Sequence, residues 1–143
     1  MNIAHFLVPK QNVAFLYNDF TLRQGLEKLR NNGYSAIPVI TRANEYVGTV
    51  SEGEFLWNLI DSQKSRELKK INIKNMEGIL VSEILRKDTN SPVRITATIE
   101  ELLLKALDYN FIPVIDDRNM FIGIITRRDI IRHFIDKKDK LPA

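Results

Sequence analysis

The sequence predicts an α/β fold in which two copies of a strand–helix–strand–strand–helix unit pack together with pseudo-twofold symmetry. Segment Ser35–Ile40 (SAIPVI) matches Asn110–Ile115 (NFIPVI) at an offset of 75 positions, 110 minus 35. The same offset aligns Gly48–Glu54 (GTVSEGE) with Gly123–Asp129 (GIITRRD) without a gap. Self-similarity held in one register indicates an internal repeat. A copy of roughly 60 residues buries too little surface to be comfortably stable alone, so we expect two paired, short-stranded sheets.

The first copy shows its elements through apolar spacing. Leu22, Leu26 and Leu29 recur at helical intervals after the polar N-cap stretch Asn18–Thr21, and Gly33 is placed to end that helix in the left-handed conformation. Two β-rich runs follow, separated by the polar turn 41–45. In chain order the predicted elements are a strand at Val13–Leu16, this helix, strands at Ala36–Ile40 and Tyr46–Val50, and a helix at Glu52–Asp61.

The second copy repeats this order with a shorter first helix. Upstream of the matched strand the register slips by two residues, because Thr21 and Leu22 correspond to Thr98 and Ile99. A short leading helix at Ser82–Leu85 resembles one at Ala4–Leu7. The predicted elements are Val93–Ile95, Ile99–Leu107, Ile112–Ile115, Phe121–Ile125 and Arg127–Asp136. We therefore divide the chain into a first repeat (1–62), a connector (63–78), a second repeat (79–137) and a tail (138–143).

The composition narrows the function classes. Net charge is +3, with basic residues gathered in the connector and the tail, a pattern typical of a solvated linker face. No helix-turn-helix, zinc-finger or RNA-binding aromatic motif supports a nucleic-acid partner. The absence of cysteine excludes zinc ribbons, thiol catalysis and disulfide scaffolds. No apolar run approaches the roughly 20 residues of a membrane span, and the first ten residues lack a signal-peptide pattern, so we expect a cytoplasmic protein without a membrane partner.

The sequence offers no catalytic constellation. His5 and His133 are the two histidines, and neither has a second ligand at metal-binding spacing. No nucleophile elbow or Walker loop is present. The sequence therefore predicts neither an enzyme, nor a metal site, nor a bound cofactor.

The two matched turns differ in charge. The second carries Arg127 and Arg128 where the first carries Glu52 and Gly53. A helix dipole disfavours cations at its N-terminus, so two adjacent arginines there favour an incoming anion. A carboxylate in the first turn would instead repel a phosphate.

Helix capping is the alternative explanation for both turns. Ser51-x-x-Glu54 has the spacing of a capping box, and Thr126-x-x-Asp129 differs from one by a methylene group. We favour a cap for the first turn and anion binding for the second.

The paired IPV strands, each followed by a G-h-h-[ST]-x-x-[DE] turn, resemble the CBS domain pair, also called a Bateman module. The resemblance covers roughly residues 1–137. It implies an adenosine-containing ligand bound in a cleft between repeats, and regulation of a partner protein rather than catalysis. The Gly-Tyr-Ser-Ala-Ile-Pro and Thr-Arg-Arg segments are similar to free-standing bacterial members that bind cyclic di-AMP. Since Asp129 suits a free ribose diol, AMP, ADP and ATP remain alternatives.

The resemblance implies a pocket that takes its base-binding strand from one repeat and its phosphate-binding turn from the other. The expected nucleotide-binding residues are Val13, Ala14, Ser35, Ala36, Ile37, Pro38, Thr126, Arg127, Arg128 and Asp129. A second, weaker site lacks a cation and comprises Ser51, Glu54, Phe111, Ile112 and Pro113.

Both final helices carry two adjacent apolar stripes. One stripe on each helix can pack on its own sheet, which leaves the other exposed in a monomer. Family members commonly dimerise through these helices, so we expect a homodimer; packing of the two helices within one chain is the alternative. The stripes comprise Phe55, Leu56, Leu59 and Ile60, and Ile130, Ile131, Phe134 and Ile135. A ligand-free protein-interaction scaffold is the alternative function, and in either case the regulated protein remains unknown.

Overall fold

The computed structural model describes residues 2–61, 77–86 and 89–139, which form two compact units. Unit 1 combines Met1–Val13 with Asn90–Ala143, and unit 2 runs from Ala14 to Thr89. The segment that leads into each sequence repeat therefore belongs to the compact unit of the other repeat. Most of the predicted connector and tail lies outside the described residues.

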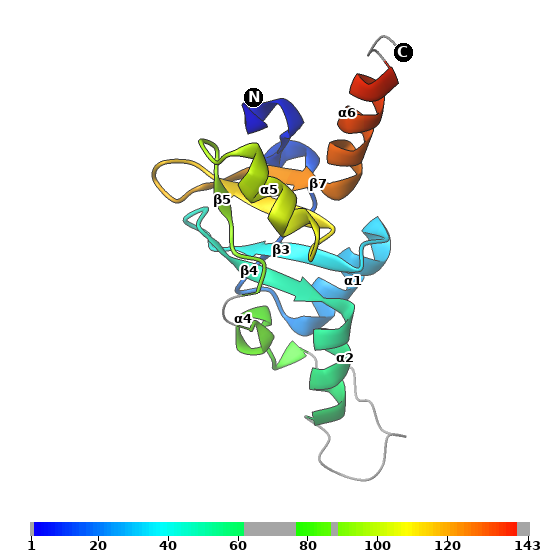
Figure 1. Cartoon of the computed structure of the whole chain (residues 1–143). Coiled ribbons are helices and arrows are strands. Elements are labelled where there is room, and N and C mark those ends of the chain that lie inside the picture. Colours follow the sequence, from blue (N-terminus) through cyan, green and yellow to red (C-terminus); the bar gives the residue numbers. More distant parts are fainter. Residues whose placement is uncertain (1, 62–76, 87–88, 140–143) are drawn as a thin grey trace. The chain divides into compact units, whose positions relative to one another are not determined.

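Unit 2 is built on a three-stranded sheet with the order β2-β3-β4 (Figure 1). Strand β2 is parallel to β3, and β3 is antiparallel to β4. The unit contains β2 (Leu16–Tyr17), α1 (Leu22–Asn32), β3 (Ala36–Ile40), β4 (Tyr46–Ser51), α2 (Glu52–Asp61) and α4 (Val81–Ile84).

Local sequence signals fix the ends of α1. Thr21 and Gln24 form a reciprocal capping box at its start. Gly33 ends it with φ of 65°, a left-handed conformation that costs glycine little. Apolar residues of α1, α2 and α4 then pack against the sheet. The buried core comprises Leu16, Leu22, Leu29, Ile37, Val39, Val50, Phe55, Val81 and Ile84.

Unit 1 has a four-stranded sheet with the order β1-β7-β6-β5. Helix α5 lies over this sheet, and its Leu102 belongs to the same buried cluster as Ile112 and Ile125 (Figure 1). The elements are η1 (Ile3–Phe6), β1 (Val8–Pro9), η2 (Lys10–Asn12), β5 (Val93–Arg94), α5 (Ile99–Ala106), β6 (Phe111–Ile115), β7 (Phe121–Thr126) and α6 (Arg127–Asp139). Among the described helices, none is long and apolar enough to cross a membrane.

In each repeated turn, the glycine packs closely against the segment that leads into the other repeat. Gly123 has φ of 155°, and a Cβ atom there would overlap the backbone carbonyl oxygen of Val8 in β1. Gly48 has the same φ, and its Cβ would lie 2.9 Å from the side chain of Leu85. Glycine therefore serves packing between the sheet and the leading segment in both units.

Most predicted elements are present, with two corrections. The first strand is Leu16–Tyr17 rather than Val13–Leu16, because Val13 instead follows η2 and donates its N–H to Lys10. Strand β1 was not predicted. The second copy of the first helix is shorter, as expected, with eight residues in α5 against eleven in α1.

Candidate functional site

Within each unit the strand and the turn of the same repeat meet. In unit 1, Phe111 pairs with Thr126, and the Arg127 N–H donates to the Asn110 carbonyl at 2.8 Å. In unit 2, Ala36 pairs with Ser51, and the Glu52 N–H donates to the carbonyl of Ser35 at 2.9 Å. The pairing of a strand from one repeat with a turn from the other stays a prediction.

The remaining predicted residues fall on both units. Val13 is buried in unit 1, whereas the half-buried Ala14 begins unit 2. In β3, Ile37 and Pro38 are buried, and in β6 Ile112 and Pro113 are buried at the same register. Their side chains support the sheets, so the half-buried Ala36 and Phe111 and the exposed Ser35 are the more accessible members of these sets.

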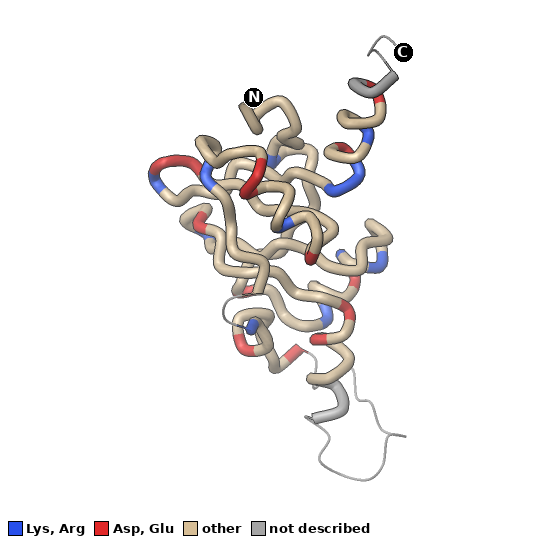
Figure 2. The backbone as a smooth tube through the Cα atoms, viewed as in Figure 1, with Lys and Arg blue, Asp and Glu red and all other residues tan. Residues whose placement is uncertain are grey.

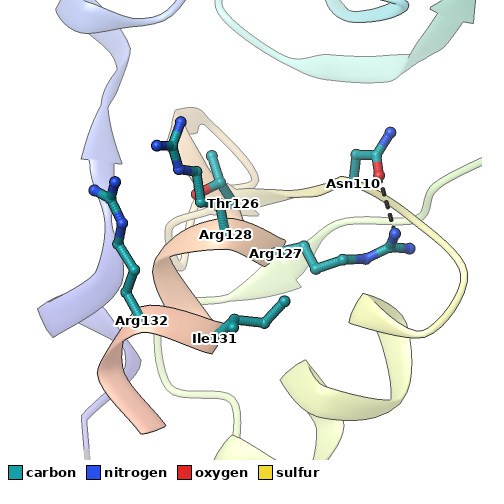
Figure 3. Close-up of a pocket in the computed structure, with 6 residues that line it drawn as sticks. All are labelled: Asn110, Thr126, Arg127, Arg128, Ile131 and Arg132. Carbon is teal, nitrogen blue, oxygen red and sulfur yellow. Dashed lines mark hydrogen bonds between the residues drawn. The ribbon is translucent and has the colours of Figure 1, made fainter. Parts of the chain in front are cut away.

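A hollow of about 530 Å³ lies where β7 leads into α6 in unit 1. Figure 3 shows the residues that line it, which are Asn110, Thr126, Arg127, Arg128, Ile131 and Arg132. The predicted Thr126, Arg127 and Arg128 are thus brought together. Figure 2 shows the same basic stretch at the start of α6.

Sequence reasoning missed three lining residues: Asn110, Ile131 and Arg132. Two of them had a usable signal. Asn110 occupies the position of Ser35 at the repeat offset, and Arg132 follows Arg128 by four residues, which places it on the same helix face.

Arg127 is committed to the end of helix α5. Its Nε donates to the carbonyl of Ala106 at 2.7 Å, and Nη2 donates to the carbonyl of Leu107 at 3.4 Å. Nη1 donates to Oδ1 of Asn110 at 3.0 Å (Figure 3). The last carbonyls of a helix have no partner within the helix, so a guanidinium satisfies them well. Of the two arginines that were predicted to bind an anion, only Arg128 is therefore available to a ligand.

We predict that Arg127→Ala lowers the free energy of unfolding by roughly 1–3 kcal/mol, since hydrogen bonds from a charged donor are lost at the end of α5. Urea unfolding monitored by circular dichroism measures this change. Arg128→Ala is the matched control and should stay within about 0.5 kcal/mol of the wild type. Equal effects of the two substitutions would contradict the structural role of Arg127.

Arg128 is exposed and has no partner among the described residues. Beside it, Thr126 Oγ1 accepts the N–H of Asp129 at 3.1 Å, which is the predicted N-terminal cap. The cap and a ligand are compatible, because the N–H groups of Arg127 and Asp129 are already bonded while that of Arg128 remains to bind an anion. An unpaired guanidinium thus stands at the positive end of a helix.

The corresponding turn of unit 2 is acidic. Ser51 Oγ accepts the N–H of Glu54 at 3.3 Å, which confirms a side-chain cap. Burial raises the pKa of Glu54, although the hydrogen bond from Ser51 and the charge of Arg86 oppose the rise. No described residue gives a hydrogen-bond partner to the buried Oε2 of Glu54. This turn has no feature that attracts a phosphate.

The raised pKa of Glu54 gives a pH-dependent prediction. Its carboxyl holds a proton more tightly in the folded than in the unfolded state, so stability is lost as pH rises from near 4.5, the ordinary pKa of a glutamate, through the folded pKa. We expect Glu54→Gln to melt at a higher temperature than the wild type at pH 8. The gap should close toward pH 4, as measured by calorimetry across this range. A constant gap would show that ionisation of Glu54 does not cause it.

No other ionisable cluster suggests a metal. Groups of three or more potential histidine or carboxylate ligands are absent from the described part of the chain. His5 and His133 instead make an edge contact, with ring centroids 5.7 Å apart, next to Phe6. They pack the N-terminal segment against α6.

Among the described residues, each final helix has one buried apolar residue of the predicted stripes and at least one exposed one. Phe55 and Ile130 are buried in their units, at 1% and 2% exposure. The outer stripes are exposed and comprise Leu56, Trp57, Ile131, Phe134 and Ile135. The side chains of Leu59 and Ile60 lie outside the described set.

The family model described as "CBS domain" matches residues 4–61 and 81–136. Cyclic di-AMP receptor B of Bacillus subtilis is 24% identical over 130 residues, covering 91% of this chain and 84% of the relative. The crystal structure of CbpB in complex with c-di-AMP has a TM-score of 0.83 and 29% identity, covering 99% of this chain and 91% of that one. The crystal structure of CBSX2 of Arabidopsis thaliana in complex with AMP has a TM-score of 0.73 and 25% identity, covering 96% of this chain and 98% of that one. An uncharacterized protein of Methanocaldococcus jannaschii is 24% identical, and this chain spans 50% of its length.

Proposed function

Because the chain belongs to the CBS domain family, with both of its halves matched, we propose that it binds an adenine nucleotide and thereby regulates a partner protein. The observation that carries the proposal is the unpaired Arg128 at the start of α6, beside a hollow large enough for part of a nucleotide. Relatives with the same fold bind c-di-AMP and AMP.

The phosphate side of the proposed site is in unit 1. The Arg128 N–H in the first turn of α6 and the Arg128 guanidinium would bind phosphate oxygens. Asn110 and Thr126 add polar groups at the rim of the hollow. The Asp129 carboxylate has no described partner and would accept a ribose hydroxyl. Arg127 supports the site indirectly, because its hydrogen bonds hold the end of α5 against this turn.

The base side is assigned to the segment Ser35–Pro38 together with Val13 and Ala14. Backbone N–H and C=O groups at a strand end can read the edge of a purine, and small side chains such as Ala36 leave room for the ring. The predicted second, weaker site lacks a cation, so we expect it to stay empty at low ligand concentration. It comprises Ser51 and Glu54 of the acidic turn with Phe111, Ile112 and Pro113.

Thermal unfolding with added nucleotide tests the proposal. Ligand at one hundred times its dissociation constant stabilises a protein by about 2.7 kcal/mol, which should raise the melting temperature by roughly 5–10 °C at this size. The ligands to compare are AMP, ADP, ATP and c-di-AMP, with GMP as the control for the base. No rise with any adenine nucleotide at millimolar concentration would contradict the proposal.

We further propose that the protein is a cytoplasmic homodimer that uses its exposed helix stripes. Leu104 of α5 and Leu107, which directly follows this helix, are 67% and 76% exposed, whereas the equivalent positions of α1 carry Glu27 and Arg30. With Ile131 and Ile135 at 50% and 53%, unit 1 thus exposes apolar residues on both of its longer helices. Contiguous exposed apolar residues are typical of an interface.

Ile135→Lys is predicted to weaken this dimer by at least tenfold, because a lysine would be buried without a partner at the interface. Sedimentation across a concentration series measures the effect. Thr96→Lys adds the same charge at an exposed loop position of the same unit and should leave the dimer intact. Wild-type protein that sediments as a monomer at high concentration would refute the homodimer.

A further inference from the structure

We propose that Arg132 binds a second phosphate, so that the preferred ligand is an adenine nucleotide with at least two phosphate groups rather than a monophosphate. This inference rests on the proposed function of the hollow at the start of α6. It assigns a role in ligand discrimination to a residue outside the repeated turn.

Arg128 and Arg132 lie on one face of α6. Residues four apart in a helix are neighbours, with Cβ atoms about 5–6 Å apart. Both side chains line the hollow. Figure 3 shows them extending toward the same side of the helix, whereas Arg127 extends the other way to Asn110. Two guanidinium groups are thus presented together, one helical turn apart.

No hydrogen bond or ion pair within the described part of the chain uses these two guanidinium groups. Both side chains are exposed, and neither has an ion pair or a hydrogen bond with a described residue. Asp129 and Asp136 stand three residues before and four after Arg132 and line a second hollow together with it, yet no ion pair joins either carboxylate to Arg132. Like charges four apart destabilise a helix by about 0.2–0.5 kcal/mol, a cost that a bound anion would offset.

The first copy of the repeat supplies a comparison within the chain. At the repeat offset, Arg128 and Arg132 correspond to Gly53 and Trp57 of α2. Both cations are therefore specific to the second copy, in which Arg127 stands at the position of Glu52 while Asp129 keeps a carboxylate at the position of Glu54. Arg128 and Arg132 thus occur only in the copy whose turn also carries Arg127, and the copy with the acidic turn has neither.

Because the guanidinium of Arg127 is bonded to the end of α5, a second phosphate would need a cation other than Arg127. Three of its donors are used by the end of α5 and Asn110, so it has little capacity left for a ligand. Arg128, through its backbone N–H and its guanidinium, suffices for one phosphate. A second phosphate needs another cation nearby, and Arg132 is the residue on that face that provides it. ADP and c-di-AMP share this chemistry, and AMP lacks it.

Isothermal titration calorimetry with AMP, ADP and c-di-AMP tests the inference on the wild type, Arg132→Gln and Arg118→Gln. Arg118 is exposed in the hairpin of the same unit, so its substitution makes the same change in net charge away from the hollow. We expect the wild type to bind ADP or c-di-AMP at least tenfold more tightly than AMP. Arg132→Gln should lose about tenfold for that ligand and less than threefold for AMP, and Arg118→Gln should change neither.

The outcomes separate this inference from the proposed function. Equal affinity of the wild type for all three ligands, or an equal loss for all three in Arg132→Gln, would overturn the role of Arg132 and leave nucleotide binding in place. Failure of the wild type to bind any of the three would overturn both. Preference for ADP over c-di-AMP, or the reverse, would identify the source of the second phosphate.

Discussion

Arg128→Gln is expected to weaken binding of adenine nucleotides by roughly 10- to 150-fold. A well-placed hydrogen bond from a charged donor contributes about 1.5–3 kcal/mol, and each 1.4 kcal/mol is a factor of ten in affinity. Arg128 has no described partner that would need to be released first, so its full donor set is available to phosphate. Calorimetric titration of c-di-AMP into each protein measures the change.

Two controls make the result for Arg128 specific. The folded state should be unaffected, because the side chain is exposed and unpaired, so the urea unfolding curve should match that of the wild type. Arg118→Gln removes the same charge elsewhere in unit 1 and should bind normally. An unchanged affinity in Arg128→Gln would show that the phosphate does not lie at the start of α6.

Gly123→Ala is expected to lower the free energy of unfolding by about 2–3 kcal/mol or more. A methyl group at this position would overlap the carbonyl oxygen of Val8, and the φ of 155° is one that L-residues rarely adopt. Strained conformations cost on the order of 1–3 kcal/mol each, and the overlap with a backbone atom cannot be relieved by a side-chain rotation. Strand β1 must separate from β7, or β7 must bend.

Gly53→Ala is the matched control for this substitution. Gly53 lies in α2, and its nearest neighbour to a new Cβ is Ser51 Oγ at 3.7 Å. Alanine should therefore stabilise the helix by roughly 0.5–1 kcal/mol. Urea unfolding of both variants should show opposite signs. Destabilisation by both substitutions would mean that the crossing of β1 over Gly123 is not the cause.

The repeat and the local helix signals could be read from the sequence because they depend on short-range chemistry. The cap at Thr21, the end of α1 at Gly33 and the boundaries of β3 follow from residue types within a few positions. The position of the basic turn could also be predicted, because the repeat offset that aligns the two IPV strands also aligns the two turns. These features need no knowledge of distant contacts.

The rest depends on contacts that no local pattern encodes. Strand β1 is two residues long and contains Pro9, so it has no periodicity, and its partner Gly123 is more than one hundred positions away. The role of Arg127 required the free carbonyls of α5 to lie beside it. Arg132 lies outside the repeated turn, and only its place on the same helix face as Arg128 connects it to the hollow.

Amide chemical shifts during titration with c-di-AMP or ADP test the central claim most directly. We expect large changes at Arg128 and Asp129 of unit 1 and, at the same ligand concentration, at Ala36 and Ile37 of unit 2. Ser51, Glu54 and Phe111 should change little at one equivalent. Saturating ligand that leaves Arg128 and Asp129 unshifted would contradict the account.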